Sequence, residues 1–353
     1  MRNINSNGMG EGQIMRLVAL MLALLTVMTV ITVAVVLIPA AVPASSVLPG
    51  VEPPKVTTGN SGNTDTPSSN YPTVTNWQNA LTAQSISLPA SESVFGEDIK
   101  STAAILVDMS SGSAMYTKDA DKRVPIASMT KVMTLIVSLD LIKSNDAFYE
   151  KVRLDPDTRA ALAKDKYQLA FNADDREAYV IDLLYTLILQ SGCDSACALA
   201  KHLAGSEEQF VSLMNQKAAA LGLENTHFAN SYGGDDENNY STVREVGEFF
   251  LYALENELAY KIITTKTGDY KFYGRYINYM YAPSLVLDAF KNHSTGGITV
   301  LGGKSGLDEQ AGYCLVSFGR DASGRKYLAV TAGNNAEPSS YTDSARIYKD
   351  YAN

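Results

Sequence analysis

An uncharged run near the N-terminus places the strongest constraint on what this 353-residue chain can form. Residues 17–38 carry no charge, and three threonines are their only polar members. A helix of this length is roughly 33 Å long, enough to cross a bilayer core of about 30 Å. Arg2 and Arg16 precede the run, which favours a cytoplasmic position for residues 1–16. We expect an uncleaved transmembrane anchor in the cell membrane, with the rest of the chain extracellular. A cleaved signal segment and a secreted protein are the alternative.

The composition changes at residue 39. Seven of the twelve prolines lie between Pro39 and Pro72, among Ser, Thr, Gly and Asn. Such a segment cannot bury enough apolar surface to offset the entropy lost on ordering. We therefore expect a disordered linker over residues 39–95 and a globular domain over residues 96–353.

Charge and the rarer residue types argue against several classes of function. The net charge of −9 disfavours a nucleic-acid partner. The three histidines are scattered without an H-x-x-x-H pair, which disfavours a zinc site, and we expect neither a metal nor a cofactor. The three cysteines form no disulfide framework and are expected to be buried free thiols. The chain has no G-x-S-x-G elbow, which weakens the case for a Ser-His-Asp hydrolase.

The stretch GGKSG at residues 302–306 raises the question of phosphate binding. A phosphate loop has the pattern G-x-x-x-x-G-K-[ST] and opens a helix. With Lys304 as its lysine, the first glycine would fall at Ile298, and Gly297 is one residue too early. The runs YCLVSFG and KYLAVTAG follow, joined by RDASGR, and they predict a β-hairpin rather than a helix. Lys304 is therefore expected to bind a different anion.

A second lysine lies inside an apolar helix pattern. The segment VPIASMTKVMTLIVSLDLIK, residues 124–143, has a proline and a serine at its start and is apolar on most sides. Ser128 and Lys131 are three residues apart, so their side chains share one face, one turn apart. Burial disfavours a charged lysine, and a neutral Lys131 could take the proton of Ser128 and activate it as a nucleophile. The alternative is an N-cap serine with a lysine that reaches solvent.

Two further stretches predict secondary structure. TAAILVDMSSGSAMYTKD predicts two strands around a Ser-Ser-Gly turn. AYVIDLLYTLILQSGCDSACALAKHLAG predicts two buried helices with a break at Ser191 and Gly192. The break places Ser191 and Cys193 at a turn, from which side chains can enter a cleft. Taken alone, Ser191 is better explained as an N-cap than as a catalyst.

Together, residues 128–131, 191–193 and 304–306 resemble the signature of the serine D-alanyl-D-alanine carboxypeptidases, which are low-molecular-mass penicillin-binding proteins. That signature is S-x-x-K, then S-x-N, then K-T-G or K-S-G, and related β-lactamases share it. The resemblance runs from about residue 99 to residue 353. It implies an α/β (α+β) fold of the β-lactamase/transpeptidase kind: an antiparallel sheet flanked by helices, with an inserted helical subdomain.

The resemblance also implies a role for each residue of the signature. Ser128 is expected to be the acylated nucleophile, Lys131 its base, and Ser191 the group that passes a proton toward the leaving group. Backbone N–H groups of Ser128 and Leu307 are expected to form the oxyanion hole. Lys304 is expected to bind the substrate's terminal carboxylate, which answers the question of its anion. The expected substrate-binding residues are Cys193, Lys304, Ser305, Gly306 and Leu307.

The implied function is removal of the terminal D-alanine from peptidoglycan stem pentapeptides, with endopeptidase activity also possible and β-lactam antibiotics as covalent inhibitors. Cys193 departs from the pattern, because a weak thiol replaces the strong donors and acceptor of asparagine. This departure keeps open a catalytically inactive wall-binding or antibiotic-sensing protein. A β-lactamase is the third possibility, but no E-x-x-L-N stretch lies between Ser191 and Lys304.

Overall fold

The computed structural model of this chain describes residues 85–89, 99–270, 272, 282–335 and 339–352. The expected cytoplasmic segment 1–16, the expected anchor 17–38 and most of the expected linker 39–95 lie outside these residues. Within the described ranges, no helix combines the length and the apolar character that crossing a membrane requires.

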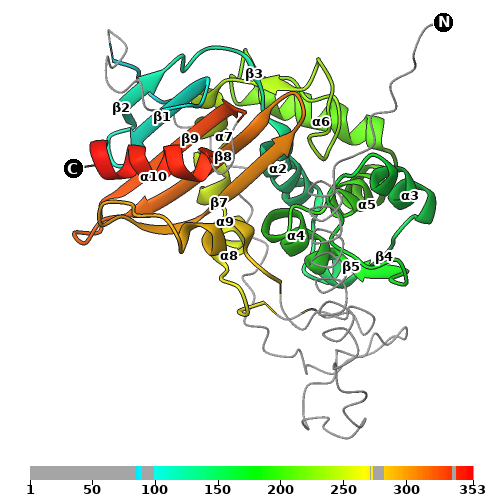
Figure 1. Cartoon of the computed structure of the whole chain (residues 1–353). Helices are drawn as coiled ribbons and strands as arrows, with labels where there is room; N and C mark the ends of the chain where they lie inside the picture. Colours follow the sequence, from blue (N-terminus) through cyan, green and yellow to red (C-terminus); the bar gives the residue numbers. More distant parts are fainter. Residues whose placement is uncertain (1–84, 90–98, 271, 273–281, 336–338, 353) are drawn as a thin grey trace, which may run out of the picture. The chain divides into compact units, whose positions relative to one another are not determined.

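The central sheet has five antiparallel strands: β1 (Ala103–Asp108), β2 (Ser113–Lys118), β7 (Thr299–Asp308), β8 (Gly312–Arg320) and β9 (Lys326–Asn334). Their order is β2-β1-β9-β8-β7, so strands from both ends of the domain meet in the middle (Figure 1). Both predicted strand pairs are confirmed, β1 with β2 and β8 with β9. Lys304 lies on β7, at the edge of the sheet, and not at the start of a helix.

Alternation along β1 divides the core into two parts, because successive strand residues point to opposite faces of a sheet. Ile105 and Val107 belong to the larger core, together with residues of α7 (Val243–Glu255). Leu106 belongs to a second core with residues of α9 (Leu285–Phe290) and α10 (Ser339–Tyr351). Helices thus cover both faces of the sheet, with α10 in front and α7 behind in Figure 1.

A helical part is inserted between β2 and β7, as the resemblance implies. Its central helix is α2 (Lys131–Leu141), whose residues are buried from Lys131 through Leu139, in agreement with the apolar pattern. The other helices are η2 (Ala127–Thr130), η3 (Asp146–Tyr149), α3 (Pro156–Lys164), α4 (Val180–Leu189), α5 (Cys193–Ala204), α6 (Glu207–Ala220) and α8 (Glu257–Thr264). Two short antiparallel pairs join β3 (Val124–Pro125) to β6 (Tyr240–Ser241), and β4 (Lys151–Arg153) to β5 (Glu177–Tyr179).

Residues 85–89 pack on the domain, although the composition places them in the linker. Ile86 is buried in the larger core, and its N–H donates to Glu248 of α7 over 3.0 Å. The N–H of Ser87 donates to the carbonyl of Gly112 over 2.9 Å. The linker expectation is therefore wrong for these five residues. Ile86 is one apolar residue within a mostly polar stretch, so the composition of the stretch does not predict its burial.

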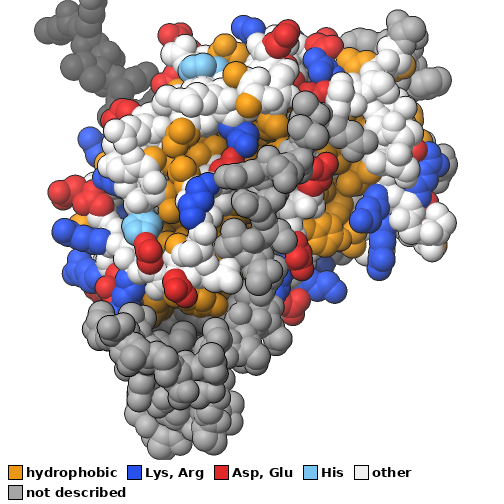
Figure 2. Space-filling model, turned by 180° about the vertical axis from the view of Figure 1, so that it is seen from behind, with side chains coloured by type: hydrophobic (Ala, Val, Ile, Leu, Met, Phe, Trp, Pro, Cys, Tyr) orange, Lys and Arg blue, Asp and Glu red, His pale blue; other side chains and the backbone are white. Residues whose placement is uncertain are grey.

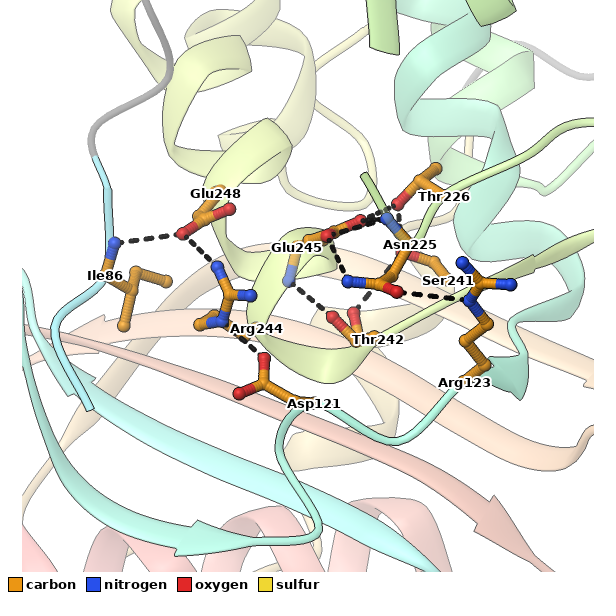
Figure 3. A network of polar contacts seen from close by, with 10 residues as sticks. All are labelled: Ile86, Asp121, Arg123, Asn225, Thr226, Ser241, Thr242, Arg244, Glu245 and Glu248. Carbon is orange, nitrogen blue, oxygen red and sulfur yellow. Dashed lines mark hydrogen bonds and ion pairs between the residues drawn. The ribbon is translucent and has the colours of Figure 1, made fainter. Parts of the chain in front are cut away.

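A polar network fastens this segment to α7 (Figure 3). Arg244 bridges two carboxylates, with Nε 2.6 Å from Asp121 and a terminal nitrogen 3.0 Å from Glu248. Glu245, which is buried, accepts from the backbone N–H of Asn225 over 2.9 Å. Each buried carboxylate thus has donors that compensate its loss of hydration.

The back of the molecule carries charges of both signs. On the face shown in Figure 2, acidic and basic side chains of the described residues are interspersed, with hydrophobic surface between them. Among the described residues visible in this view, neither sign gathers into one continuous patch.

Candidate active site

Ser128 lies in the 3-10 turn η2, and Lys131 is the first residue of α2. The Lys131 Nζ donates to Ser128 Oγ over 2.7 Å, as the spacing of three residues predicts. The alternative of an N-cap serine and a solvated lysine is wrong. Thr130 occupies the N-cap position of α2, and the Lys131 side chain is fully buried.

Lys131 has two further partners that fix its ammonium group. Its Nζ donates to the carbonyl of Tyr232 over 2.6 Å and contacts Cys193 Sγ at 3.3 Å. With Ser128, these partners occupy all three donor directions of an ammonium group. The sequence could not reveal the Tyr232 contact, because a backbone carbonyl leaves no signature in side-chain type.

Two glycines allow close packing around the turn that carries Ser128. A Cβ on Gly233, whose φ is +75°, would lie 2.0 Å from the carbonyl oxygen of Ala127. A Cβ on Gly306 would lie 3.1 Å from the nitrogen of Ser128. Ala127 itself has a φ of +44°, a left-handed conformation that non-glycine residues rarely adopt. The turn is thus held between β7 and the loop at Gly233, and such strained backbone is typical of functional sites.

The side chains of Ser191 and Lys304 are in contact, close to Lys131. Lys304 Nζ donates to Ser191 Oγ over 2.8 Å and to the carbonyl of Ser305 over 2.6 Å. Ser191 has a φ of +59°, and the N-cap of α5 is Gly192, so the interpretation of Ser191 as an N-cap is wrong. The structure therefore joins all three stretches of the signature around one site.

Burial and the nearby charge of Lys131 lower the pKa of Lys304 well below its ordinary value near 10.5. Two ammonium groups in one buried site repel each other, and each loses hydration. Within the described part of the chain, neither lysine forms an ion pair with a carboxylate. An incoming anion beside Lys304 would relieve this repulsion, so the site favours a negatively charged ligand group.

Cys193 is the first residue of α5 and is buried. Its N–H donates to the carbonyl of Gln168 over 2.8 Å, and its sulfur faces Lys131. The thiol therefore lies in the interior beside Lys131 rather than at an open surface. All three cysteines are free and buried, as predicted.

Three residues of β7 that follow Lys304, namely Ser305, Gly306 and Leu307, differ in their contacts. The Ser305 carbonyl accepts from Lys304 Nζ. Gly306 packs on the turn that carries Ser128, and the Leu307 side chain is 57% exposed. The structure thus brings Gly306 and the Ser305 carbonyl to the site.

Asp194 positions the segment before β5 against α5, and the sequence analysis did not identify it. It is buried in the first turn of α5, and its carboxylate accepts from the N–H groups of Ala170 at 2.9 Å and Phe171 at 3.2 Å. Burial nevertheless raises the pKa of Asp194. Its bonds hold the segment before β5 against the start of α5, next to Cys193. An acidic residue in the first turn of a helix was the available signal.

The chain is similar to known proteins of one family. A family model described as D-alanyl-D-alanine carboxypeptidase matches residues 89–335, well over half of the chain. A D-alanyl-D-alanine carboxypeptidase of Streptomyces sp. is 31% identical over 247 residues, which cover 67% of this chain and 81% of that protein. Among solved structures, a Streptomyces DD-transpeptidase has a TM-score of 0.62 at 26% identity and covers 72% of this chain and 99% of its own. Penicillin binding protein 5 of Haemophilus influenzae has a TM-score of 0.61 at 27% identity, covering 72% and 71%.

Two other curated relatives are matched over about half of their length. D-alanyl-D-alanine carboxypeptidase DacF of Bacillus subtilis is 35% identical over 173 residues, which are 49% of this chain and 42% of that protein. DacA of Escherichia coli is 31% identical over 235 residues, which are 65% of this chain and 55% of that protein.

Proposed function

The chain belongs to the D-alanyl-D-alanine carboxypeptidase family, and on this basis we propose that it removes the terminal D-alanine from peptidoglycan stem pentapeptides. The observation that carries the proposal is the 2.7 Å contact between Lys131 Nζ and Ser128 Oγ inside a buried site. A lysine within hydrogen-bond reach supplies the base that a serine needs when no histidine is beside it.

The proposed reaction requires the neutral form of Lys131, which takes the proton of the Ser128 hydroxyl. The freed Oγ attacks the carbonyl carbon of the penultimate D-alanine, and the N–H groups of Ser128 and Leu307 stabilise the oxyanion. The bond to the terminal D-alanine then breaks, and the proton that Lys131 took from Ser128 passes through Ser191 to the leaving nitrogen. Water finally attacks the ester on Ser128 and releases the shortened peptide.

Lys304 supplies the proposed recognition of the substrate's terminal carboxylate. The carboxylate supplies the anionic partner that is missing beside the two buried lysines. Its negative charge favours the protonated form of Lys304. Since Lys304 also donates to Ser191, carboxylate binding and proton delivery are linked through one side chain.

β-Lactam antibiotics are the proposed covalent inhibitors, because the same attack by Ser128 opens a strained amide ring. In class A β-lactamases a glutamate activates the water that clears the acyl group. The E-x-x-L-N stretch that usually carries it is absent between Ser191 and Lys304. The penicilloyl group is therefore expected to remain on the protein.

Two measurements on the purified protein test the proposal: release of D-alanine from a pentapeptide, and the intact mass after penicillin treatment. Release of D-alanine together with a stable adduct supports a carboxypeptidase. An adduct without D-alanine release indicates the sensor, and multiple turnover of penicillin indicates a β-lactamase.

Changing Cys193 to asparagine tests the departure from the family signature. A thiol in place of an amide forfeits about one or two hydrogen bonds to substrate, each worth roughly 0.5–1.5 kcal/mol. We expect Cys193→Asn to retain kcat/KM on a D-Ala-D-Ala peptide or to raise it by up to about tenfold, since 1.4 kcal/mol corresponds to a factor of ten. Cys197→Ser, one turn along α5, is the matched control and should leave kcat/KM unchanged. An inactive but folded Cys193→Asn protein would show that the contact between the thiol and Lys131 is required.

We propose that residues 17–38 attach the protein to the cell membrane, with the domain on the outer side. Two features of the sequence support this proposal. The uncharged run, as a helix, is roughly as long as the bilayer core is thick, and two arginines precede it. The full-length protein should then stay with membranes through a high-salt wash and be released only by detergent. A soluble form that begins near residue 45 would show that the segment is cleaved.

A further inference from the structure

The loop that follows α6 directs the ammonium group of Lys131. Lys131 of α2 donates to the backbone carbonyl of Tyr232 over 2.6 Å. Thr134, one turn further along α2, donates to the carbonyl of the preceding loop residue, Ser231. Two consecutive carbonyls of the loop thus accept from two side chains on one face of α2. The position of this loop therefore limits where the Lys131 Nζ can point.

The same loop supports the turn that carries Ser128. A Cβ on Gly233 would lie 2.0 Å from the carbonyl oxygen of Ala127 and 3.0 Å from the nitrogen of Ser128. The loop backbone therefore packs directly on this turn. The reaction needs the Ser128 Oγ within hydrogen-bond reach of the Lys131 Nζ, and the two atoms are 2.7 Å apart. A displacement of the loop would move the base and the support of the nucleophile together.

Glu207, in the first turn of α6, holds this loop from a different helix. Its Oε1 accepts the backbone N–H of Ser231 over 2.8 Å. Asn230 supplies a second set of contacts, since its Oδ1 accepts from the N–H groups of Gly233 at 2.7 Å and Gly234 at 2.8 Å. The Asn230 contacts lie within the loop and set its local shape. The Glu207 contact instead ties the loop to α6.

The second carboxylate oxygen of Glu207 indicates that stability alone does not explain this residue. Oε2 is buried, and no donor reaches it among the described residues. The Cys197 thiol and the Tyr232 ring are close enough for its charge to act on them. A buried oxygen without a donor costs free energy, so an apolar side chain would destabilise the fold less at this point. Glu207 is better explained by what its other oxygen does, which is to hold Ser231.

We infer that Glu207 is a positioning residue for the acylation step. By holding the Ser231 N–H, it keeps the Tyr232 carbonyl in place. That carbonyl in turn aligns the Lys131 Nζ with the Ser128 hydroxyl. The inference rests on the proposed function and adds a residue of α6 that contacts neither reacting group. What matters is the reach of the Glu207 acceptor oxygen, and not the charge of the carboxylate.

Two substitutions separate the reach of Glu207 from its charge. Glu207→Gln keeps an acceptor oxygen at the same distance from the backbone and removes the charge. Glu207→Asp keeps the charge and shortens the side chain by one methylene. We expect the rate constant for acylation by penicillin to fall by about ten- to a hundredfold in Glu207→Asp and in Glu207→Ala, since a displacement of about 1 Å can cost a hundredfold. Glu207→Gln should keep most of the wild-type rate constant.

Saturation kinetics distinguish positioning from a general loss of structure. The rate constant for acylation should fall, while the dissociation constant of the preceding non-covalent penicillin complex should change little, because Glu207 bonds to Ser231 and not to the proposed ligand-binding groups. Glu208→Ala is the matched control. It removes the exposed acidic residue next to Glu207 in the same helical turn and should acylate like the wild type. Melting temperatures of all variants show whether the fold is kept.

The possible outcomes separate this inference from the function on which it rests. Wild-type acylation by a folded Glu207→Asp protein would overturn the inference and leave the carboxypeptidase assignment intact. A Glu207→Gln protein as slow as Glu207→Asp, or a loss confined to the dissociation constant, would overturn it as well. If Glu207→Ala does not fold, the comparison of the Gln and Asp variants still decides. A wild type that neither forms a penicillin adduct nor releases D-alanine would overturn the proposed function and this inference with it.

Discussion

Replacing Ser128 with alanine is expected to abolish covalent labelling by fluorescent penicillin and release of D-alanine, while the protein stays folded. The side chain is half-buried in the η2 turn, and its Oγ is the only group that the proposed attack can use. Loss of the nucleophile of a serine hydrolase costs about a millionfold in kcat. Removing one hydroxyl from a short turn should change the melting temperature little.

A second serine gives the control for this variant. Ser212 lies exposed on α6. Its Oγ accepts a hydrogen bond from Gln216 Nε2 over 3.2 Å. Ser212→Ala should label and turn over like the wild type. Labelling that persists in a folded Ser128→Ala protein would show that another residue carries the acyl group.

Lys131→Arg is expected to lower the second-order rate of acylation by penicillin by about two to four orders of magnitude. That is the usual contribution of a positioned general base, and an arginine cannot release its proton near neutral pH. The substitution keeps a positive charge and donors that can reach Ser128 and the carbonyl of Tyr232. The two side chains differ in proton transfer and in bulk, so stability must be measured separately.

Thermal unfolding separates these two effects. Overpacking a buried site costs typically 1–3 kcal/mol, which lowers the melting temperature without setting the rate of chemistry. Lys201→Arg, on the exposed side of α5, is the matched control and should acylate normally. A folded Lys131→Arg protein that acylates at the wild-type rate would show that Lys131 is structural.

The sequence alone determined the local parts of this site. Ser128 and Lys131 are three residues apart at a helix start, and helical geometry by itself brings such side chains together. The strand pairs β1 with β2 and β8 with β9 follow from apolar runs on either side of short turns. The order of the three signature stretches then identified the family, because chance matches to three separate motifs in sequence are rare.

Only the tertiary structure decided how distant residues combine. Lys304 and Ser191 are 113 residues apart, and Lys131 and Cys193 are 62 apart. No local rule relates such pairs, since their contact depends on how β7 and α5 pack around α2. Packing also placed Ser191 in a left-handed conformation.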